Sequence, residues 1–402
     1  MELVKDATLA IHGGTPVRAS YLSYGKQFIS EEDIAKVVET LRSPYLTQGP
    51  TIKEFEEKIA KVVGAKYAVA FTNGTAALHG ACFAARIGEG DEVITTPLTF
   101  AASANCVRYC GGTVVFADIC PDTYNIDPEQ IRKQITERTK AIIPVDFTGQ
   151  PAKLDEIMKM AKEHNLVVIE DAAHSLGATY QGKPVGSIAD MTMFSFHPVK
   201  HITTGEGGII ATDSEEYYQR LLLFRSHGIT RDTALLQRKS EGPWYYEMQD
   251  LGYNYRMTDI QAALGISQLS SLVQFVARRR QIASLYNKQL AHLPLVLPYQ
   301  ASEGESSWHL YVIQLQLEKL TVGRKEIFEA LVAENIGVNV HYIPVHLQPY
   351  YQAAGYEAGL APQAEALYER IITLPLFPTM SDDDVFDVVK AVEKVMKAYE
   401  KK

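Results

Sequence analysis

The stretch AKLDEIMKMAKEHNLVVIED, residues 152–171, joins a helical pattern at 152–165 to a short run that is almost entirely apolar. A nearly continuous apolar run of this length is typical of a strand that is covered on both faces of a parallel sheet. Helical patterns such as 127–135 separate several runs of this kind, which predicts crossover connections and a doubly wound α/β domain. The other strand-like runs occupy residues 66–72, 92–97, 113–119, 141–147, 191–197 and 207–213.

Two helices are expected before this sheet, at residues 30–41 and 51–64. The first opens with Ser-x-x-Asp and the second with Thr-x-x-Glu, both of which are capping-box patterns. We therefore expect both helices to begin at the hydroxyl residue of the pattern.

The pattern changes after residues 257–269, where a long helical stretch continues through 277–291. We interpret this stretch as a bridge between a large α/β domain, residues 1–265 with the N-terminal segment, and a smaller α+β domain, residues 266–402. The arginines at 278–280 are expected to lie on a charged face of the bridging helix. The remaining elements expected in the smaller domain are strands at 308–315 and 337–344, a helix at 323–336 and a final helix that begins at Ser381 with a capping box.

The composition limits the functions that this chain can have. Its 402 residues, 46% of them hydrophobic, can form a large core, and the formal net charge is -9. This acidic balance argues against a nucleic-acid or anionic-membrane partner, either of which would favour a basic surface. No apolar run approaches the roughly 20 residues of a membrane span, and the first residues lack the apolar core of a signal peptide. We therefore expect a cytoplasmic protein.

Neither the cysteines nor the histidines predict a metal site. His197 and His201 are four residues apart, but Pro198 disfavours the regular helix that would bring them to one ion. The cysteines have no paired CxxC spacing, so we expect reduced, mostly buried side chains. They are Cys82, Cys106, Cys110 and Cys120.

Two polar features follow strand-like runs. Asp171 ends the run LVVIED, and ligands of open α/β sheets gather at the carboxyl ends of strands. Its carboxylate could cap the segment AAHSLG, or it could pair with a protonated pyridine nitrogen, as pyridoxal phosphate enzymes require. The segment TNGTAA, residues 72–77, follows another strand and offers helix-start amides, small residues and a threonine hydroxyl, which suit a phosphate.

The third feature is Lys200, in SFHPVKHITTGEGG at residues 195–208. It follows a strand-like run and precedes a glycine-rich turn. A lysine amine becomes nucleophilic when burial or neighbours lower its pKa, and it could then hold an aldehyde cofactor as a Schiff base. Most lysines are simply solvated, but together the three features fit one chemistry, that of pyridoxal phosphate.

The ordered motifs of the chain resemble the DegT family of pyridoxal phosphate-dependent sugar-nucleotide aminotransferases. The likeness rests on LTQGP, TNGTAALH, PLTFAASAN, EDAAHS, FSFHPVK, ITTGEGG, FRSHGI, LGYNYRMTDIQAALG and VHYIP, and it extends over nearly the whole chain. It implies a fold-type I enzyme whose cofactor is bound by the large domain. Within the family, LTQG, HPVK with ITTGEGG, FRSHGI and VHYIP look most like the 4-aminotransferases of pseudaminic acid synthesis.

The resemblance implies a role for each matching residue of the cofactor site. Lys200 would hold the cofactor and then move a proton between the cofactor carbon and the substrate carbon. Asp171 would pair with the pyridine nitrogen, His174 would lie near the ring hydroxyl, and Phe100 would stack on the ring. The residues that would hold the phosphate are Gly74, Thr75 and Ser195.

Asn254, in LGYNYRM, matches an asparagine that reaches the cofactor phosphate of the neighbouring subunit, so the resemblance implies a homodimer with shared active sites. It also implies substrate contacts from the start of the chain and from the small domain. These residues are Tyr24, Pro44, Tyr45, Leu46, Thr47, His341 and Tyr342.

The implied reaction is ping-pong transamination. L-Glutamate would convert the cofactor to its amine form and leave as 2-oxoglutarate, and the amine form would then aminate a keto sugar. The implied acceptor is UDP-2-acetamido-2,6-dideoxy-β-L-arabino-hexos-4-ulose, aminated at C4. The residues themselves leave open the sugar configuration, the nucleotide, amination at C3 or C4, and glutamine as the donor.

Three other functions remain as alternatives. One is another sugar-nucleotide 3- or 4-aminotransferase. The second is a sugar 3-dehydratase, which resembles this family but has histidine at the lysine position; here Lys200 occupies that position and a histidine appears only beside it, as His201. The third is a non-catalytic pyridoxal phosphate-binding protein, which usually carries an appended nucleic-acid-binding segment that this chain does not show.

Overall fold

The computed structural model describes residues 8–401. Its main sheet consists of β1 (Tyr67–Phe71), β2 (Glu92–Thr95), β3 (Thr113–Phe116), β4 (Thr139–Ile143), β5 (Val167–Asp171), β8 (Met191–Ser195) and β9 (Gly208–Thr212). The strand order is β1–β9–β8–β5–β4–β2–β3. β8, β5, β4, β2 and β3 are parallel, and β9 is antiparallel to both of its neighbours. The mostly parallel α/β sheet expected from the sequence is therefore confirmed.

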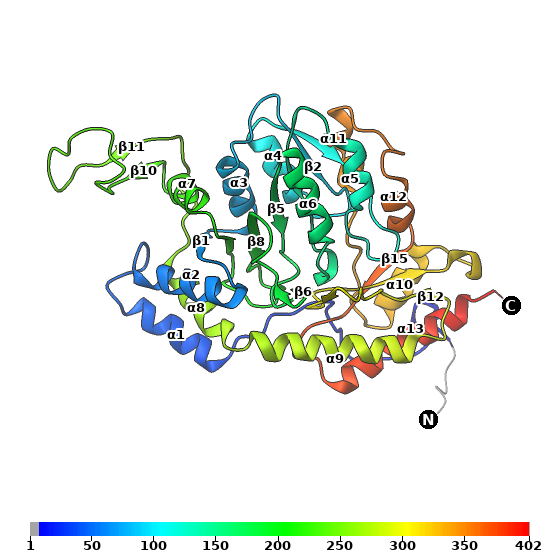
Figure 1. The fold of residues 1–402 in the computed structure, drawn as a ribbon. Helices are drawn as coiled ribbons and strands as arrows, with labels where there is room; N and C mark the ends of the chain where they lie inside the picture. The colour runs from blue at the N-terminus through cyan, green and yellow to red at the C-terminus, as the bar shows by residue number, and fades with distance from the viewer. Residues whose placement is uncertain (1–7, 402) are drawn as a thin grey trace.

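Helices cover both faces of this sheet (Figure 1). One apolar cluster joins the sheet to α3 (Gly74–Ala84), α4 (Ala102–Tyr109) and α7 (Glu215–Arg225). On the other face the sheet packs against α2 (Pro50–Val63), α5 (Pro128–Gln134), α6 (Leu154–His164) and α8 (Asp259–Leu269). Burial from both sides explains why the strands are almost continuously apolar.

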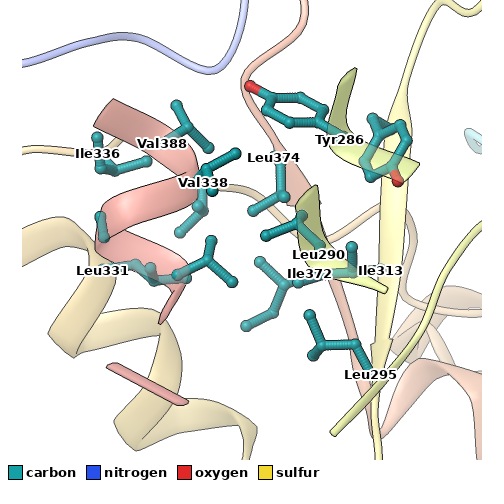
Figure 2. Close-up of a cluster of buried hydrophobic side chains, with 14 of the residues drawn as sticks. Tyr286, Leu290, Leu295, Ile313, Leu331, Ile336, Val338, Ile372, Leu374 and Val388 are labelled. Carbon is teal, nitrogen blue, oxygen red and sulfur yellow. The ribbon is translucent and has the colours of Figure 1, made fainter. Parts of the chain in front are cut away.

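The C-terminal part has its own apolar cluster (Figure 2). Its sheet has the order β12–β14–β15, and helices α9, α10 and α13 pack against it. Leu9 and Leu22 of the N-terminal segment also belong to this cluster. The division at residues 265 and 266, which falls inside α8, stays a proposal. These elements are α9 (Leu272–Leu290), β12 (Leu295–Val296), β14 (Tyr311–Leu315), α10 (Arg324–Ala333), β15 (Ile371–Leu374) and α13 (Asp382–Tyr399).

The other elements are short or lie at the periphery. An arm that contains a two-stranded hairpin, β10 and β11, projects from the end of α7 (Figure 1). The remaining bounds are η1 (Ala10–His12), α1 (Glu31–Leu41), η2 (Phe147–Gly149), β6 (Thr179–Tyr180), β7 (Lys183–Pro184), β10 (Ile229–Thr230), β11 (Glu247–Met248), β13 (Gly304–Glu305), η3 (Leu317–Lys319), η4 (Val345–Leu347), α11 (Pro349–Ala353) and α12 (Pro362–Tyr368).

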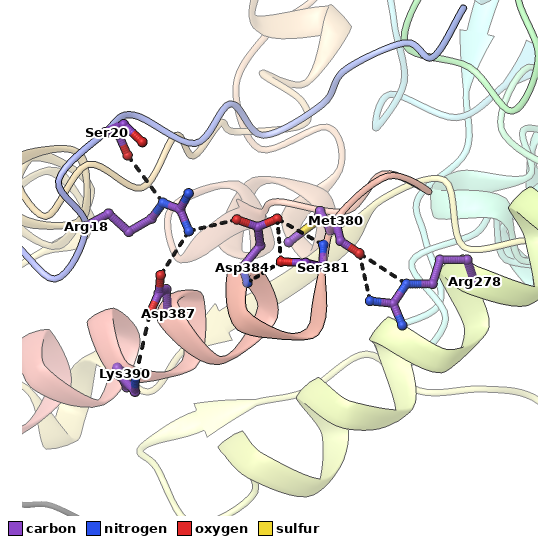
Figure 3. Close-up of polar contacts among 8 residues, drawn as sticks. All are labelled: Arg18, Ser20, Arg278, Met380, Ser381, Asp384, Asp387 and Lys390. Carbon is purple, nitrogen blue, oxygen red and sulfur yellow. Dashed lines mark hydrogen bonds and ion pairs between the residues drawn. The ribbon is translucent and has the colours of Figure 1, made fainter. Parts of the chain in front are cut away.

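Two of the three predicted helix starts are confirmed. Ser30 and Ser381 form capping boxes at the starts of α1 and α13, the second drawn in Figure 3. The prediction for α2 is wrong, because this helix begins at Pro50 with Gly49 as its N-cap. The amides of Gly49 and Thr51 donate instead to the carboxylate of Asp259, at 2.8 and 3.1 Å. A carboxylate from a distant helix thus replaces the local cap.

The long helical stretch expected after residues 257–269 is confirmed as α9, which meets α8 at a bend of 59°. The prediction of a strand at 337–344 is wrong. Within residues 8–401 this segment forms an isolated bridge between Asn339 and Thr373, and the amide of Gly337 donates to the carbonyl of Leu22 at 2.7 Å, before residues 339–342 line the cavity described below.

Polar contacts tie the N-terminal segment and the bridge to α13 (Figure 3). Arg18 contacts Asp384 at 2.8 Å and Asp387 at 2.9 Å, and Arg278 donates to the carbonyl of Met380 at 2.7 Å. Within residues 8–401 no single helix has the length and apolar character to cross a membrane; α8 and α9 taken together would pass by length and composition alone. The cysteines are free thiols, buried except for the half-buried Cys110, as predicted.

Candidate active site

A cavity of about 810 Å³ lies where β5 and β8 end. The large sheet and its helices form one wall, and residues 339–342 of the C-terminal part form another. The cavity therefore occupies the position at which parallel sheets usually bind ligands. Most of the predicted site residues line it: Tyr24, Gly74, Thr75, Phe100, Asp171, His174, Ser195, Lys200, His341 and Tyr342.

Asp171 is the last residue of β5, and both oxygens of its carboxyl group form hydrogen bonds. Its Oδ2 accepts from Ser103 Oγ at 2.6 Å, and its Oδ1 accepts from the amide of Ala173 at 3.1 Å. Burial raises the pKa of Asp171, whereas the two donors and nearby Lys200 act in the opposite direction. The following residues form a turn rather than a helix, so Asp171 does not act as a helix cap.

The start of α3 forms a polar corner of the cavity. The Asn73 side chain caps the helix by accepting from the amide of Ala76 at 2.8 Å. The preceding amides, of Gly74 and Thr75, have no carbonyl partner within the helix, as for any first helical turn. A Cβ on Gly74 would lie 3.4 Å from Ser195 Cβ and 3.5 Å from Ser195 Oγ, so it would occupy space beside this hydroxyl. Amides, hydroxyls and the positive helix end together suit a phosphate.

Lys200 follows β8 and extends into the cavity beside several neutral histidines. Its Nζ lies 3.4 Å from His309 Nε2. Burial lowers the pKa of Lys200 to about 8, with Arg279 adding to the decrease and Asp171 opposing it. Burial also lowers the pKa of His174 and of His309 well below the usual range. The amine is therefore less basic than a solvated lysine and closer to its nucleophilic form near neutral pH.

Aromatic and imidazole rings form the remaining wall. Phe100 is 62% exposed, so it is not the core residue that a buried phenylalanine usually represents. The hydroxyl of Tyr342 lies 3.1 Å from His174 Nε2. His174 Nδ1 is buried and has no hydrogen-bond partner within residues 8–401. His341 is buried beside Thr373, whose hydroxyl lies 2.8 Å from its Nδ1.

The structure does not bring every predicted residue to this cavity. Asn254 and residues 44–47 are exposed and do not line it. They lie near one another, because Thr47 forms a bridge with Thr258 and the carbonyl of Leu46 accepts from the amide of Asp259 at 3.0 Å. These residues therefore do not contribute to the cavity of their own chain.

Three neighbours of the site were missed by the sequence analysis. Ser103 binds Asp171, His309 lies beside Lys200, and Arg279 is buried behind them. The prediction that Arg279 lies on a charged helix face is wrong: it is 1% exposed and donates to three backbone carbonyls. The available signals were a serine within PLTFAASAN and a histidine just before the strand-like LYVIQL.

The arrangement fits pyridoxal phosphate. The carboxylate of Asp171, the Lys200 amine of lowered pKa and the corner that suits a phosphate line one cavity. The Phe100 side chain is exposed and can stack on a cofactor ring. His174 Nδ1, buried without a partner among the described residues, provides a polar atom for the ring substituents. No residue in this set conflicts with such a cofactor.

Comparisons with known proteins agree with this site. The spore coat polysaccharide biosynthesis protein SpsC of Bacillus subtilis is 45% identical over 94% of this chain and 98% of its own length. The Helicobacter pylori aminotransferase PseC, involved in pseudaminic acid biosynthesis, superposes with a TM-score of 0.88 at 33% identity, over 94% of this chain and 100% of that one. The putative sugar aminotransferase Spr1654 of Streptococcus pneumoniae, solved in its PLP form, has a TM-score of 0.87 at 33% identity, over 94% and 99%.

A model of the DegT/DnrJ/EryC1/StrS aminotransferase family matches residues 27–393. The fold is that of fold-type I enzymes, and the Streptococcus relative has been solved with both the aldehyde and the amine form of the cofactor. This chain therefore belongs to the DegT/DnrJ/EryC1/StrS family of sugar aminotransferases, whose cofactor is pyridoxal phosphate.

Proposed function

We propose that this enzyme transfers the amino group of L-glutamate to C4 of UDP-2-acetamido-2,6-dideoxy-β-L-arabino-hexos-4-ulose. The product would be UDP-4-amino-4,6-dideoxy-N-acetyl-β-L-altrosamine, a precursor of pseudaminic acid-type glycans. The observation that carries the proposal is the meeting of Lys200 and Asp171 in one cavity with Tyr24, His341 and Tyr342. The likeness to PseC over nearly the whole length of both chains supports the choice of substrate.

The bound cofactor supplies an electron sink that stabilises negative charge at the reacting carbon. In this proposal Lys200 provides the amine that holds the cofactor and then moves a proton at that carbon. Asp171 stays ionised through its two donors and holds positive charge on the pyridine nitrogen. Gly74, Thr75 and Ser195 bind the phosphate. These roles need a lysine of lowered pKa, and Lys200 has one.

At the position where the 3-dehydratases have histidine, this chain has Lys200, which lines the cavity, and this favours transamination over 3-dehydration. His201, which could be mistaken for the dehydratase histidine, is 2% exposed, and its Nε2 lies 3.2 Å from the carbonyl of Ser307. It is not among the residues that line the cavity. The lysine at position 200 therefore supports a reaction that transfers an amino group.

The substrate is proposed to contact residues of two chains. Tyr24, His341 and Tyr342 would come from the chain that holds the cofactor, and residues 44–47 with Asn254 from its partner. Exposed apolar side chains surround the second group, with Tyr45 at 54%, Leu46 at 46% and Leu251 at 68% exposure. The loop between α1 and α2 and the arm of β10 and β11 lie at the same end of the molecule (Figure 1). A homodimer would cover these side chains.

The first test is the absorbance spectrum of the purified protein before and after addition of L-glutamate, with Lys200→Ala as the comparison. We expect a visible cofactor band that glutamate converts to the amine form, and no such band in the variant. L-Glutamine, offered separately, tests the choice of donor. The amine form is then mixed with UDP-linked 4-keto and 3-keto sugars, and NMR of the product shows which carbon was aminated. A converted cofactor with no product from any 4-keto sugar refutes the proposed acceptor.

A second candidate is amination of a different sugar nucleotide at C3 or C4. The observation that favours it is the 45% identity to SpsC, whose name places it in spore coat polysaccharide biosynthesis. The same product analysis separates the two. An enzyme of this second kind would aminate a 3-keto sugar, or a 4-keto sugar of another configuration, in preference to the proposed acceptor.

A further inference from the structure

His309 approaches Lys200 from a part of the chain far away in sequence. Its Nε2 lies 3.4 Å from Nζ, and its ring centroid lies 4.4 Å from that of His174. The ring is 4% exposed. Since Lys200 follows β8 of the large sheet and His309 precedes β14, this contact joins the two parts of the molecule.

The backbone at His309 is held from both sides. Its amide donates to the carbonyl of Thr148 at 2.8 Å, and its carbonyl accepts from Arg279 at 3.1 Å. Arg279 also donates to the carbonyl of Leu376 at 2.8 Å, which anchors the guanidinium. Trp308 has a φ of 51°, which is uncommon for a bulky residue and is tolerated when its surroundings enforce it. These contacts fix the direction of the imidazole.

Gly149 allows the approach. It has a φ of 106°, and a Cβ there would lie 2.7 Å from the His174 carbonyl oxygen, 2.9 Å from the Trp308 amide nitrogen and 3.0 Å from the His309 amide nitrogen. Only glycine lets the two backbones come this close. The loop at Gly149 and the segment before β14 can therefore pack closely enough for His309 to reach Lys200.

The surroundings of the imidazole favour one tautomer. His309 Nδ1 is buried and has no hydrogen-bond partner within residues 8–401. Buried N–H groups without a partner are rarer than buried acceptors without one. The proton is therefore placed on Nε2, which donates to the lone pair of an unprotonated Lys200 amine.

We propose that His309 is a positioning residue that holds the amine of Lys200 unprotonated and directed into the cavity whenever that lysine is free. The proposal rests on the proposed role of Lys200. It assigns to His309 a hydrogen bond that favours the neutral amine, in addition to the effect of burial. When Lys200 takes up a proton, the lone pair is occupied and this hydrogen bond is lost.

Other titratable groups surround the same amine. Asp171 of β5 attracts a proton to Nζ, and the buried guanidinium of Arg279 repels it. The neighbouring imidazoles are held neutral by burial. Among these imidazoles, only that of His309 forms a hydrogen bond with Nζ of Lys200 within residues 8–401. The titratable groups that interact electrostatically with Lys200 are Asp171, His174, His201, Arg279, His309 and His341.

The test measures how fast the full-length chain, stripped of cofactor, captures added pyridoxal phosphate at different pH values. The aldehyde and the amine condense, with loss of water, only when Nζ is unprotonated, so the midpoint of the pH profile reports the pKa of Lys200. In His309→Leu we expect the midpoint to rise by about 0.5 to 1 pH unit, the size of one lost hydrogen bond. Burial by an apolar side chain alone would lower it, so the direction is diagnostic.

Matched variants separate this role from packing. His309→Gln keeps a donor near the position of Nε2 and should restore most of the midpoint. His201→Leu removes a buried imidazole that does not contact Nζ, and it should leave the midpoint unchanged. If His309→Leu does not fold, His309→Asn, which withdraws the donor, makes the same comparison. An unmoved or lowered midpoint in a folded variant overturns the proposal. Equal capture by Lys200→Ala would instead refute the proposed role of Lys200.

Discussion

At the scale of single residues, the ionisation of Asp171 depends on a side chain that no motif identifies as functional. Burial alone would favour the neutral acid, and the hydroxyl of Ser103 at 2.6 Å opposes this. A hydrogen bond to a charged group contributes about 1.5–3 kcal/mol. Ser103 is therefore a positioning residue for the carboxylate that would face the cofactor.

We expect Ser103→Ala to raise the pKa of Asp171 and to move the acidic limb of the activity profile to higher pH. The reaction needs the carboxylate, which exists only above its pKa, so a raised pKa removes activity at pH values where the unmodified enzyme still works. At a pH on this limb, kcat/KM should fall about tenfold or more, because losing a hydrogen bond of this strength raises a pKa by about one or more. The measurement is kcat/KM between pH 5 and 9.

Thr99→Val is the matched control, because the Thr99 hydroxyl lies 2.8 Å from Ser103 Oγ, and no hydrogen bond joins it to Asp171 among the described residues. Its acidic limb should stay in place. An equal displacement of the limb in both variants would mean that local packing, rather than the donor to Asp171, sets the profile.

The sequence predicted residues at strand ends but not their partners. Asp171, Ser195 and Lys200 follow apolar runs, and parallel strands bring such positions to one edge. Ser103 and His309 reach the same place from 68 residues before Asp171 and 109 residues after Lys200. No local pattern encodes a contact over such a separation, so only the folded chain reveals it.

At the scale of elements, burial explains which predictions succeeded. Strands covered on both faces produce long apolar runs, so the main sheet could be predicted. The cap of α2 could not, since its carboxylate comes from Asp259, at the start of α8. The segment 337–344 resembles a strand because it is half-buried and extended, but it forms an isolated bridge at Asn339 rather than a regular strand before it enters the cavity. Whether a segment pairs as a strand depends on its neighbours in space, and the sequence of residues 337–344 alone does not specify those neighbours.

The close approach at Gly149 leads to a prediction for the junction between η2 and the segment before β14. We expect Gly149→Ala to destabilise the protein by more than about 3 kcal/mol, because it adds a backbone clash to the cost of a positive φ. Gly182→Ala, in the turn between β6 and β7, adds a Cβ at a φ of 77° where no atom of residues 8–401 lies within 4 Å. It should cost only about 1–2 kcal/mol. Denaturant unfolding measures both.

A second readout links this junction to the active site. If Gly149→Ala folds, the displaced segment should withdraw His309, and the pH midpoint for pyridoxal phosphate capture should rise as in His309→Leu. Gly182→Ala should leave that midpoint unchanged. Equal stability losses in the two variants would show that the positive φ, and not the close approach, determines the cost.

At the scale of the whole molecule, the exposed residues of the motifs need an explanation. Asn254 and residues 46–47 belong to motifs that resemble the family, yet they and residues 44–45 lie outside the cavity of their own chain. The projecting arm adds Trp244 at 69% and Met248 at 61% exposure. In the homodimer proposed above, a second copy would cover these exposed apolar side chains and would place Asn254 near another cavity.

Hybrid dimers test this arrangement directly. Lys200→Ala should abolish activity, and Asn254→Ala should weaken cofactor binding enough to inactivate the enzyme at low cofactor concentration. In a hybrid of the two variants, one site carries both substitutions and the other carries neither, if Asn254 acts across the interface. Random exchange makes half of the dimers hybrids, so roughly a quarter of the sites should be intact and activity should recover to about that level. If each site is built from one chain, every site in the mixture carries one substitution and no activity returns. A mixture of Lys200→Ala with Lys200→Met is the control, because every site in it lacks the lysine. It should recover no activity in either arrangement, which shows that subunit exchange alone does not restore activity.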